Sequence, residues 1–354
     1  MKLILLSLLI LQSFSLFAQD NKELAWNKAK EALKLMDNGK IEESISLLEE
    51  CKKLDPEEFT YPYEIAYANV LKKDYKTAIK ILNKVKKYKK LNSQVYQMSG
   101  NCYSHLGNSK KAIKEYETGM KQFPNSGNLH LEKGNVFLNQ KMYSEAVINY
   151  KNGIKVDPMY PSNYYRLALI YLNSNNKLNG LIYGEIFMNI ERTTPRTQEI
   201  SGLLYKTYKE SMTFSEDGTK AELDFCDITL SIEDLEKGNL TLPLCAAFGK
   251  NFILGTLGHN KINLGSLSKI RNNFIDLFFK EDYKEYPNVL FEYHKTLVDN
   301  GFFEAYNYYI LQIGAPEEFQ EWLKSNQETF DKFVDWYTEN KNIISVDLKN
   351  RFVD

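Results

Sequence analysis

Apolar and polar residues alternate along most of the chain with the spacing of amphipathic helices. One stretch, GNCYSHLGNSKKAIKEYETGMKQFP, runs from Gly100 to Pro124 and contains two amphipathic segments separated by Gly107. Apolar residues that recur every three or four positions form one face of a helix, so each segment predicts a helix with one buried side. Glycine permits a tight turn, and proline cannot continue a helix. The stretch is therefore predicted to fold as a helical hairpin.

This hairpin pattern recurs with a period of about 34 residues. Small residues recur once in the first half and once in the second half of each unit. They are Ala32, Ala66, Gly100, Gly134 and Ala168, and Ser44, Ala78, Ala112, Ala146 and Gly180. Small residues are expected where two helices cross, because larger side chains would hold the helix axes apart. The predicted units are 25–58, 59–92, 93–126, 127–160 and 161–194.

The units are not equally regular. The third and fourth fit the pattern best, whereas the second has Lys90 in place of the proline. In the fifth, Gly184 replaces a large apolar residue, and the turn NSNNKLNG is long. Pro195 then begins one further helix, to about Met212, which we expect to cap the last apolar face.

The period and the layout of small residues, glycine and proline resemble the tetratricopeptide repeat, a helix-turn-helix unit. The resemblance implies an all-α solenoid of about five repeats with a capping helix, over residues 25–212. In this family the first helix of each unit lines a concave groove, usually through positions 2, 5, 9, 12 and 13 of the unit. On this alignment the predicted peptide-binding residues are Tyr63, Tyr67, Gln97, Asn101, Asn135, Asn139, Tyr165 and Asn173.

The asparagines suggest how such a groove would work. An amide both donates and accepts hydrogen bonds, so a row of amides could hold the backbone of an extended peptide. The tyrosines would add apolar area and a polar tip. The alternative is that asparagine is simply common in this chain. A clamp for a terminal carboxylate, with lysine at position 5, is not expected, because those positions hold other residues.

The 34-residue pattern stops near residue 212, where the polar stretch TFSEDGTKAE predicts a boundary. Residues 213–354 are predicted to form a mainly helical C-terminal domain. Helices are expected near 241–256, 264–280, 287–300, 302–313 and 316–340. LDFCDITLSI predicts a short strand or an extended linker. Trp322, Phe330, Phe333 and Trp336 recur at helical spacing, which we interpret as core rather than as a ligand site.

Residues 1–18 have the pattern of a secretory signal peptide. Lys2 precedes an apolar run from Leu3 to Leu11, and Ala18 is a small residue at the expected cleavage point. The run is short and interrupted by polar residues, which disfavours the alternative of a membrane anchor, and no later segment predicts stable membrane insertion. We therefore expect an exported, periplasmic protein, with secretion as the alternative.

Export makes disulfide bonds possible. Cys226 and Cys245 are the candidate pair, because they lie close together in the less regular region; the alternative is that all four cysteines are small buried apolar residues. The formal net charge of −1 argues against nucleic acid as a partner. The lysine-rich run from Lys72 to Lys90 is interpreted as a solvated face, with a dock for an acidic partner or lipid as the alternative.

The sequence contains no motif typical of metalloproteases, serine hydrolases, nucleotide-binding loops or dinucleotide-binding folds. No cofactor, metal or enzymatic activity is therefore predicted. The leading hypothesis is an adaptor in the cell envelope that holds a peptide segment of a partner protein. One alternative is a C-terminal domain that binds a small ligand or lipid in an apolar cavity, with the repeats as a tether. Another is an unrecognised enzyme with a polar cleft near His259 or His294. The whole arrangement resembles exported tetratricopeptide proteins of the Bacteroidota.

Overall fold

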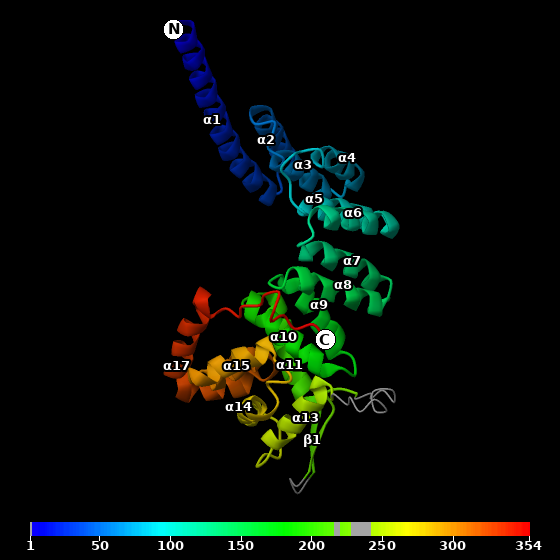
Figure 1. The fold of residues 1–354 in the computed structure, drawn as a ribbon, viewed down its shortest axis with the longest axis vertical. Helices are drawn as coiled ribbons and strands as arrows, with labels where there is room; N and C mark the ends of the chain where they lie inside the picture. The colour runs from blue at the N-terminus through cyan, green and yellow to red at the C-terminus, as the bar shows by residue number, and fades with distance from the viewer. Residues whose placement is uncertain (1, 216–219, 228–241) are drawn as a thin grey trace. The chain divides into compact units, whose positions relative to one another are not determined.

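The computed structural model describes residues 2–215, 220–227 and 242–354, with the side chains of residues 2–18 left outside that description. Helices make up nearly all of the regular structure in these residues (Figure 1). The chain divides into two compact units, Met1–Ala146 and Val147–Asp354. The predicted all-α repeat fold is confirmed. The predicted signal peptide lies outside the residues whose side chains are described.

The first compact unit consists of helices that pair as the 34-residue period predicts. They are α1 (Lys2–Asp37), α2 (Ile41–Leu54), α3 (Thr60–Leu71), α4 (Tyr75–Val85), α5 (Gln94–His105), α6 (Ser109–Gln122) and α7 (Gly127–Asn139). Helix α8 (Tyr143–Val156) begins at the end of this unit and belongs mainly to the second. Each predicted unit thus contributes one hairpin.

Local signals set the ends of these helices. The side chain of Asp74 accepts a hydrogen bond from the Thr77 amide at 3.0 Å, and Asn108 caps α6 in the same way. Such caps satisfy amides that have no partner inside the helix. Gly107 turns the chain between α5 and α6 with φ +74°, which glycine adopts without strain.

Each apolar cluster in the first unit is shared between successive hairpins. One cluster joins Ala29 and Ala32 of α1 to Leu48 of α2 and to Tyr61 and Ile65 of α3. A hairpin therefore cannot bury its apolar face alone, which is the physical reason that such units stack.

The second compact unit contains the last repeat and the C-terminal helices. After α8 come α9 (Pro161–Leu172), α10 (Lys177–Glu191), α11 (Pro195–Glu210), α13 (Leu244–Gly255), α14 (Leu264–Glu281), α15 (Val289–Asp299), α16 (Phe303–Leu311) and α17 (Pro316–Thr338). Short 3₁₀ helices, η1 (Gln312–Gly314) and η2 (Asn340–Asn342), flank α17. These bounds agree with the predicted helices to within a few residues.

A small sheet follows α11. Strand β1 (Met212–Phe214) pairs antiparallel with β2 (Ala221–Leu223), with Met212 opposite Leu223. The predicted strand LDFCDITLSI overlaps β2 only at Leu223, and its residues from 228 onward lie outside the described residues. Cys226 and Cys245 form a disulfide with their Cα atoms 6.6 Å apart, and Cys51 and Cys102 are free and buried.

Helix α10 is the centre of the second unit. Every residue from Leu178 to Asn189 is buried, because α9, α11 and α15 all contact this helix. The capping helix α11 begins at Pro195, and Thr194 before it forms a capping box with Thr197. The compact unit thus starts within the repeat array, and the C-terminal helices pack directly on the last repeat.

In the part of the chain covered by the description, no helix is long and apolar enough to cross a membrane.

Candidate functional site

The first helices of the first two repeats carry large apolar side chains that face solvent. On α1, Trp26 is 56% exposed and Leu33 40%; on α3, Tyr67 is 41% exposed and Leu71 45%. The opposite faces of both helices share one buried cluster. Single exposed apolar residues are ordinary, but a set on neighbouring helices is typical of an interaction surface. We call Trp26, Leu33, Tyr67 and Leu71 the apolar strip.

Two partly buried residues lie next to Tyr67 on α3. Tyr63 packs edge-on against Phe59 with the ring centroids 6.4 Å apart, and burial raises the pKa of Tyr63 to about 12. Glu64 is partly buried as well, and burial raises the pKa of its carboxyl group. The strip therefore has one acidic group at its edge.

Helices α5 and α7, which contact each other, carry a polar network instead. The Ser93 hydroxyl donates to Asn128 Oδ1 at 3.1 Å, and Asn128 Nδ2 donates to Gln97 Oε1 at 2.8 Å. Gln97 Nε2 donates to Glu132 Oε1 at 2.9 Å, and Asn135 Nδ2 donates to Glu132 Oε2 at 3.1 Å. We call these five residues the amide network. In this network, two of the residues predicted to bind peptide, Gln97 and Asn135, donate hydrogen bonds to the same carboxylate, that of Glu132.

The other predicted asparagines of the first unit have different surroundings. Asn101 Oδ1 accepts a hydrogen bond of 2.6 Å from the hydroxyl of Tyr116, whose side chain is 1% exposed. Burial raises the pKa of Tyr116, so this phenol stays protonated and needs an acceptor. Asn139 is exposed at the last turn of α7. Asn101 thus has a structural task in addition to any binding role.

The remaining predicted residues, Tyr165 and Asn173, belong to the second compact unit. The Tyr165 hydroxyl donates to Glu199 Oε2 at 2.6 Å, and the Arg196 guanidinium lies 4.9 Å from the Tyr165 ring centroid. Asn173 Nδ2 donates to the carbonyl of Leu169 at 2.8 Å at the end of α9. The predicted set is therefore divided between the two units.

A buried ionic cluster ties α10 to the C-terminal helices. Arg271 Nη2 on α14 donates to both oxygens of Glu185 on α10, at 2.8 and 2.6 Å, and His294 Nε2 on α15 lies 2.9 Å from Glu185 Oε2. Burial alone would raise the pKa of Glu185, but the charge of Arg271 and the contact with His294 lower it to about 2. Burial lowers the pKa of His294.

This cluster is closed to anything of substrate size. The adjoining cavity measures about 10 Å³, which is room for about one water molecule. Phe248, Phe252, Phe274 and Phe291 line it together with Arg271, whose buried Nη1 has no hydrogen-bond partner among the described residues. The cavity thus supports neither a lipid-binding pocket nor a polar catalytic cleft around His294.

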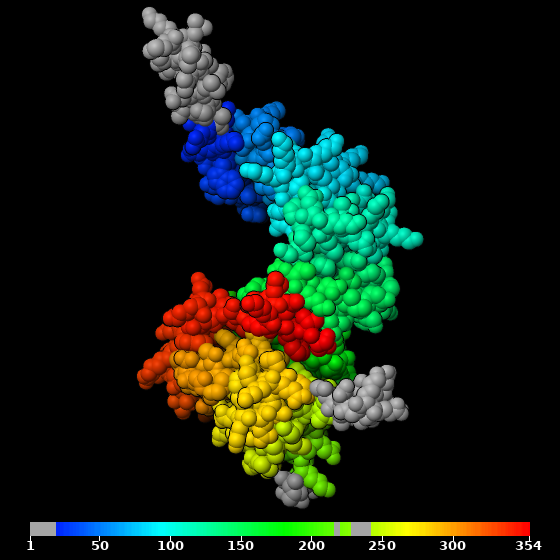
Figure 2. Space-filling model, viewed as in Figure 1, coloured from blue at the N-terminus to red at the C-terminus, as the bar shows by residue number. Residues whose placement is uncertain are grey.

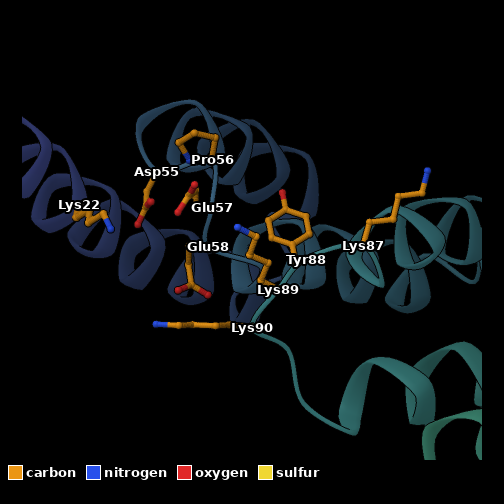
Figure 3. Close-up of a pocket in the computed structure, with 9 residues that line it drawn as sticks. All are labelled: Lys22, Asp55, Pro56, Glu57, Glu58, Lys87, Tyr88, Lys89 and Lys90. Atoms are coloured by element: carbon orange, nitrogen blue, oxygen red, sulfur yellow. The ribbon is translucent and has the colours of Figure 1, made fainter. Parts of the chain in front are cut away.

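An open pocket lies at the edge of the first unit, between the turn after α2 and the turn after α4 (Figure 3). Its volume is about 430 Å³. Carboxylates and ammonium groups both line it, from Lys22, Asp55, Glu57, Glu58, Lys87, Lys89 and Lys90, together with Pro56 and Tyr88. Part of the lysine-rich run therefore faces acidic side chains of its own chain. Among the described residues, no group of His, Cys, Asp and Glu is placed to hold a metal ion.

Comparison with known proteins agrees with the geometry of the hairpins. Residues 93–126 match the family model of the tetratricopeptide repeat, and residues 134–175 match a second model, TPR repeat. The chain therefore contains tetratricopeptide repeats. No curated protein matches its sequence.

Several solved structures are similar to this repeat protein. YrrB, described as a TPR protein with an unusual peptide-binding site, is 20% identical, with 52% of this chain and 94% of YrrB covered and a TM-score of 0.34. TTC0263, a TPR protein of Thermus thermophilus, is 16% identical, with 51% and 98% covered and a TM-score of 0.42. The C-terminal part of a TPR protein from Cytophaga hutchinsonii is 11% identical, with 82% and 96% covered and a TM-score of 0.40.

Several residues of the candidate site in this repeat protein were not among those predicted from the sequence. Leu33, Leu71 and Asn128 occupy groove positions 9, 13 and 2 of their units, so a complete application of the alignment would have found them. Glu132 falls at position 6 and had no such signal, although it joins Gln97 to Asn135.

Proposed function

We propose that the repeat protein binds an extended peptide segment of a partner protein along α1, α3, α5 and α7. Its repeats make it a protein–protein interaction scaffold. The observation that carries the peptide proposal is the exposure of Trp26, Leu33, Tyr67 and Leu71 on the first helices of the first two repeats.

The two parts of this face favour different features of a peptide. The apolar strip offers area for apolar side chains, and its aromatic rings have few rotatable bonds to immobilise. The amide network offers donors and acceptors that suit a peptide backbone. An extended segment that crosses both would gain affinity from the strip and orientation from the amides.

The proposal includes a location in the cell envelope, in the periplasm or outside the cell. The signal-peptide pattern of residues 1–18 supports it, as does the bond between Cys226 and Cys245, because disulfides persist in oxidising compartments.

The test is a peptide library displayed on phage and selected on the wild-type chain. Affinities of the selected peptides are then measured for Tyr67→Ala and, as a matched control, for Tyr143→Ala, another exposed tyrosine of the first unit at 55% exposure. We expect Tyr67→Ala to weaken binding at least about tenfold, as removal of a central aromatic anchor does. Tyr143→Ala should leave binding within about twofold of the wild type.

Equal affinities for both variants would contradict the proposal. Asparagine-to-alanine variants are a poorer first choice for this test. Asn101→Ala would leave the buried Tyr116 hydroxyl without its acceptor, so a loss of binding could reflect a loss of stability.

A further inference from the structure

Residues 343–354 lie against the repeat helices of the second compact unit (Figures 1 and 2, red). After η2 the segment has no regular helix or strand. Ile344 and Val346 are buried, and the Val346 amide donates to Met159 Sδ at 3.5 Å. At the end of the segment, Asp354 contacts side chains of three helices, α8, α9 and α10.

The side chain of Asp354 is held by four donors. Lys151 Nζ of α8 lies 2.9 Å from Oδ2, and Asn179 Nδ2 of α10 donates to Oδ2 at 2.7 Å. The hydroxyl of Tyr171 on α9 donates to Oδ2 at 3.0 Å, and that of Tyr183 on α10 donates to Oδ1 at 2.5 Å. Lys151 Nζ also donates to the main-chain oxygen of Asp354 at 2.8 Å. This is a complete binding site for one carboxylate.

An aromatic contact lies beside the carboxylate. The ring of Phe352 packs on that of Tyr183 with the centroids 5.1 Å apart. The site therefore recognises two features of the segment, an aromatic ring and, two residues later, an acidic side chain.

The donors are held by the repeat helices rather than by the segment. Tyr183 is fully buried, and its ring packs on those of Tyr164 and Tyr171 at 6.1 and 5.9 Å. Asn179 is 8% exposed, and Lys151 Nζ lies 5.6 Å from the Tyr171 ring centroid. A site with its donors fixed by packing loses little freedom when a ligand binds.

The segment, in contrast, is loosely attached between its two ends. Asp347, Leu348 and Lys349 are exposed, with Leu348 at 61%. The side chains of Lys151 and Asp354 keep 18% and 20% exposure, so water can reach the ion pair and replace its partner when the segment leaves. None of residues 347–354 is fully buried, so their release, which uncovers the Tyr183 ring, is expected at a lower free-energy cost than unfolding of the unit.

We propose that Lys151, Tyr171, Asn179 and Tyr183 form a second peptide-binding site, for partner segments that carry an acidic side chain two residues after an aromatic one. Residues 343–354 occupy this site within the chain and compete with such a partner. The site lies in the second compact unit and does not depend on the groove of the first.

The test uses the full-length chain and a fluorescent peptide with the sequence of residues 343–354. Asp354→Lys empties the site, because the introduced ammonium is repelled by Lys151. The peptide should bind this variant at least about tenfold more tightly than the wild-type chain, whose site is occupied. Asp347→Asn removes an exposed charge from the same segment but keeps an oxygen that can accept from the Lys349 and Asn350 amides, so it is the matched control and should bind like the wild type.

Peptide variants test the recognition itself. Asp354→Asn in the peptide should weaken binding about tenfold or more, since a charged partner is lost, whereas Asp347→Asn should have no effect. Tyr67→Ala in the chain should also have no effect, which separates this site from the groove. Should Asp354→Lys fail to fold by circular dichroism, the uncharged variant Asp354→Ala replaces it.

Either of two results would overturn the proposal. One is a folded Asp354 variant that binds the peptide no better than the wild-type chain. The other is a peptide with Asp354→Asn that binds as well as the unchanged peptide.

Discussion

Two lysines occupy a backbone conformation that suits glycine. Lys73 and Lys141 have φ of +61° and +60°, and they stand at the same repeat position as Gly39 and Gly107, the mid-unit turns of the first and third units. The left-handed conformation costs a residue with a side chain about 1–2 kcal/mol. The turn geometry is therefore imposed by the stacked helices, even where the sequence does not favour it.

Lys141→Gly should stabilise the first compact unit by about 0.5–1 kcal/mol, the strain that is relieved less the extra entropy that glycine loses. Urea unfolding of the variant and the wild type measures this difference. Gln140→Gly is the matched control, because Gln140 has φ −90° and gains nothing from glycine. A destabilising Lys141→Gly would show that the turn is not strained.

His294 makes the stability of the second unit depend on pH. Burial lowers its pKa in the folded chain below the value of about 6.5 that it has when unfolded. The unfolded chain therefore takes up a proton first as pH falls. The stability that the neutral His294 contributes is fully present above pH 6.5. It is lost as the pH falls below 6.5, by up to about 1.4 kcal/mol per pH unit.

This prediction is checked by the free energy of unfolding between pH 8 and pH 5. His294→Gln removes the titrating group, so the difference in slope between variant and wild type isolates it from His130 and His259. The pKa of Glu185 is about 2 in the folded chain, so this carboxyl group affects the slope only as the pH approaches its unfolded value of about 4.3, and contributes little above pH 5.5. Identical slopes for variant and wild type would contradict the assignment.

The repeat alignment selects candidate groove positions, but it cannot show which side chains those residues contact. The alignment selected Gln97, Asn101 and Asn135 from their positions in the repeat. It could not show that Asn101 satisfies Tyr116 or that Glu132 joins Gln97 to Asn135, because these are contacts between different helices. Their predicted role in peptide binding stays a prediction.

At the scale of helices, the spacing of small residues was the most informative signal. Gly180 shows why: a Cβ atom there would lie 2.5 Å from the backbone nitrogen of Leu172 on α9. Backbone cannot move aside as a side-chain tip can, so α9 and α10 pack this closely only with glycine at the crossing. Helix bounds were also predictable, because glycine, proline and the period of apolar residues are local features of the sequence.

Gly180→Ala should destabilise the second unit by about 1–3 kcal/mol through overpacking. Gly249→Ala is the matched control, because Gly249 lies in α13, where an added Cβ atom would have no neighbour within 4 Å and alanine should raise helix propensity. Thermal unfolding followed by circular dichroism compares the two. A neutral Gly180→Ala would mean that α9 and α10 can separate without loss.

At the scale of the whole molecule, the compact units and the domains predicted from periodicity divide the chain at different residues. The second unit begins at Val147, whereas the end of the pattern suggested residue 213. Glu185 and Arg271 are 86 residues apart in the chain, and their ion pair fixes the C-terminal helices to the last repeat. A pairing at that distance leaves no periodic trace in a single sequence.

The proposed export makes a prediction for the mature protein in its own cells. Cleavage after Ala18 would give a chain that begins at Gln19, and an oxidising compartment would preserve the bond between Cys226 and Cys245. Intact-mass measurement of the purified protein, alkylated after unfolding, should show two labelled thiols, from Cys51 and Cys102. Reduction before alkylation should raise the number to four.

The measured mass reports cleavage of residues 1–18, and the number of labelled thiols reports the disulfide, so the two are tested separately. A chain that keeps residues 1–18 but carries the disulfide would be oxidised without the predicted cleavage. A chain that begins at Gln19 with four free thiols would be exported without a stable bond. A protein that stays in a reducing cytoplasm would show neither cleavage nor disulfide, so that result would contradict the cell-envelope proposal and leave both peptide-binding sites to be tested against cytoplasmic partners.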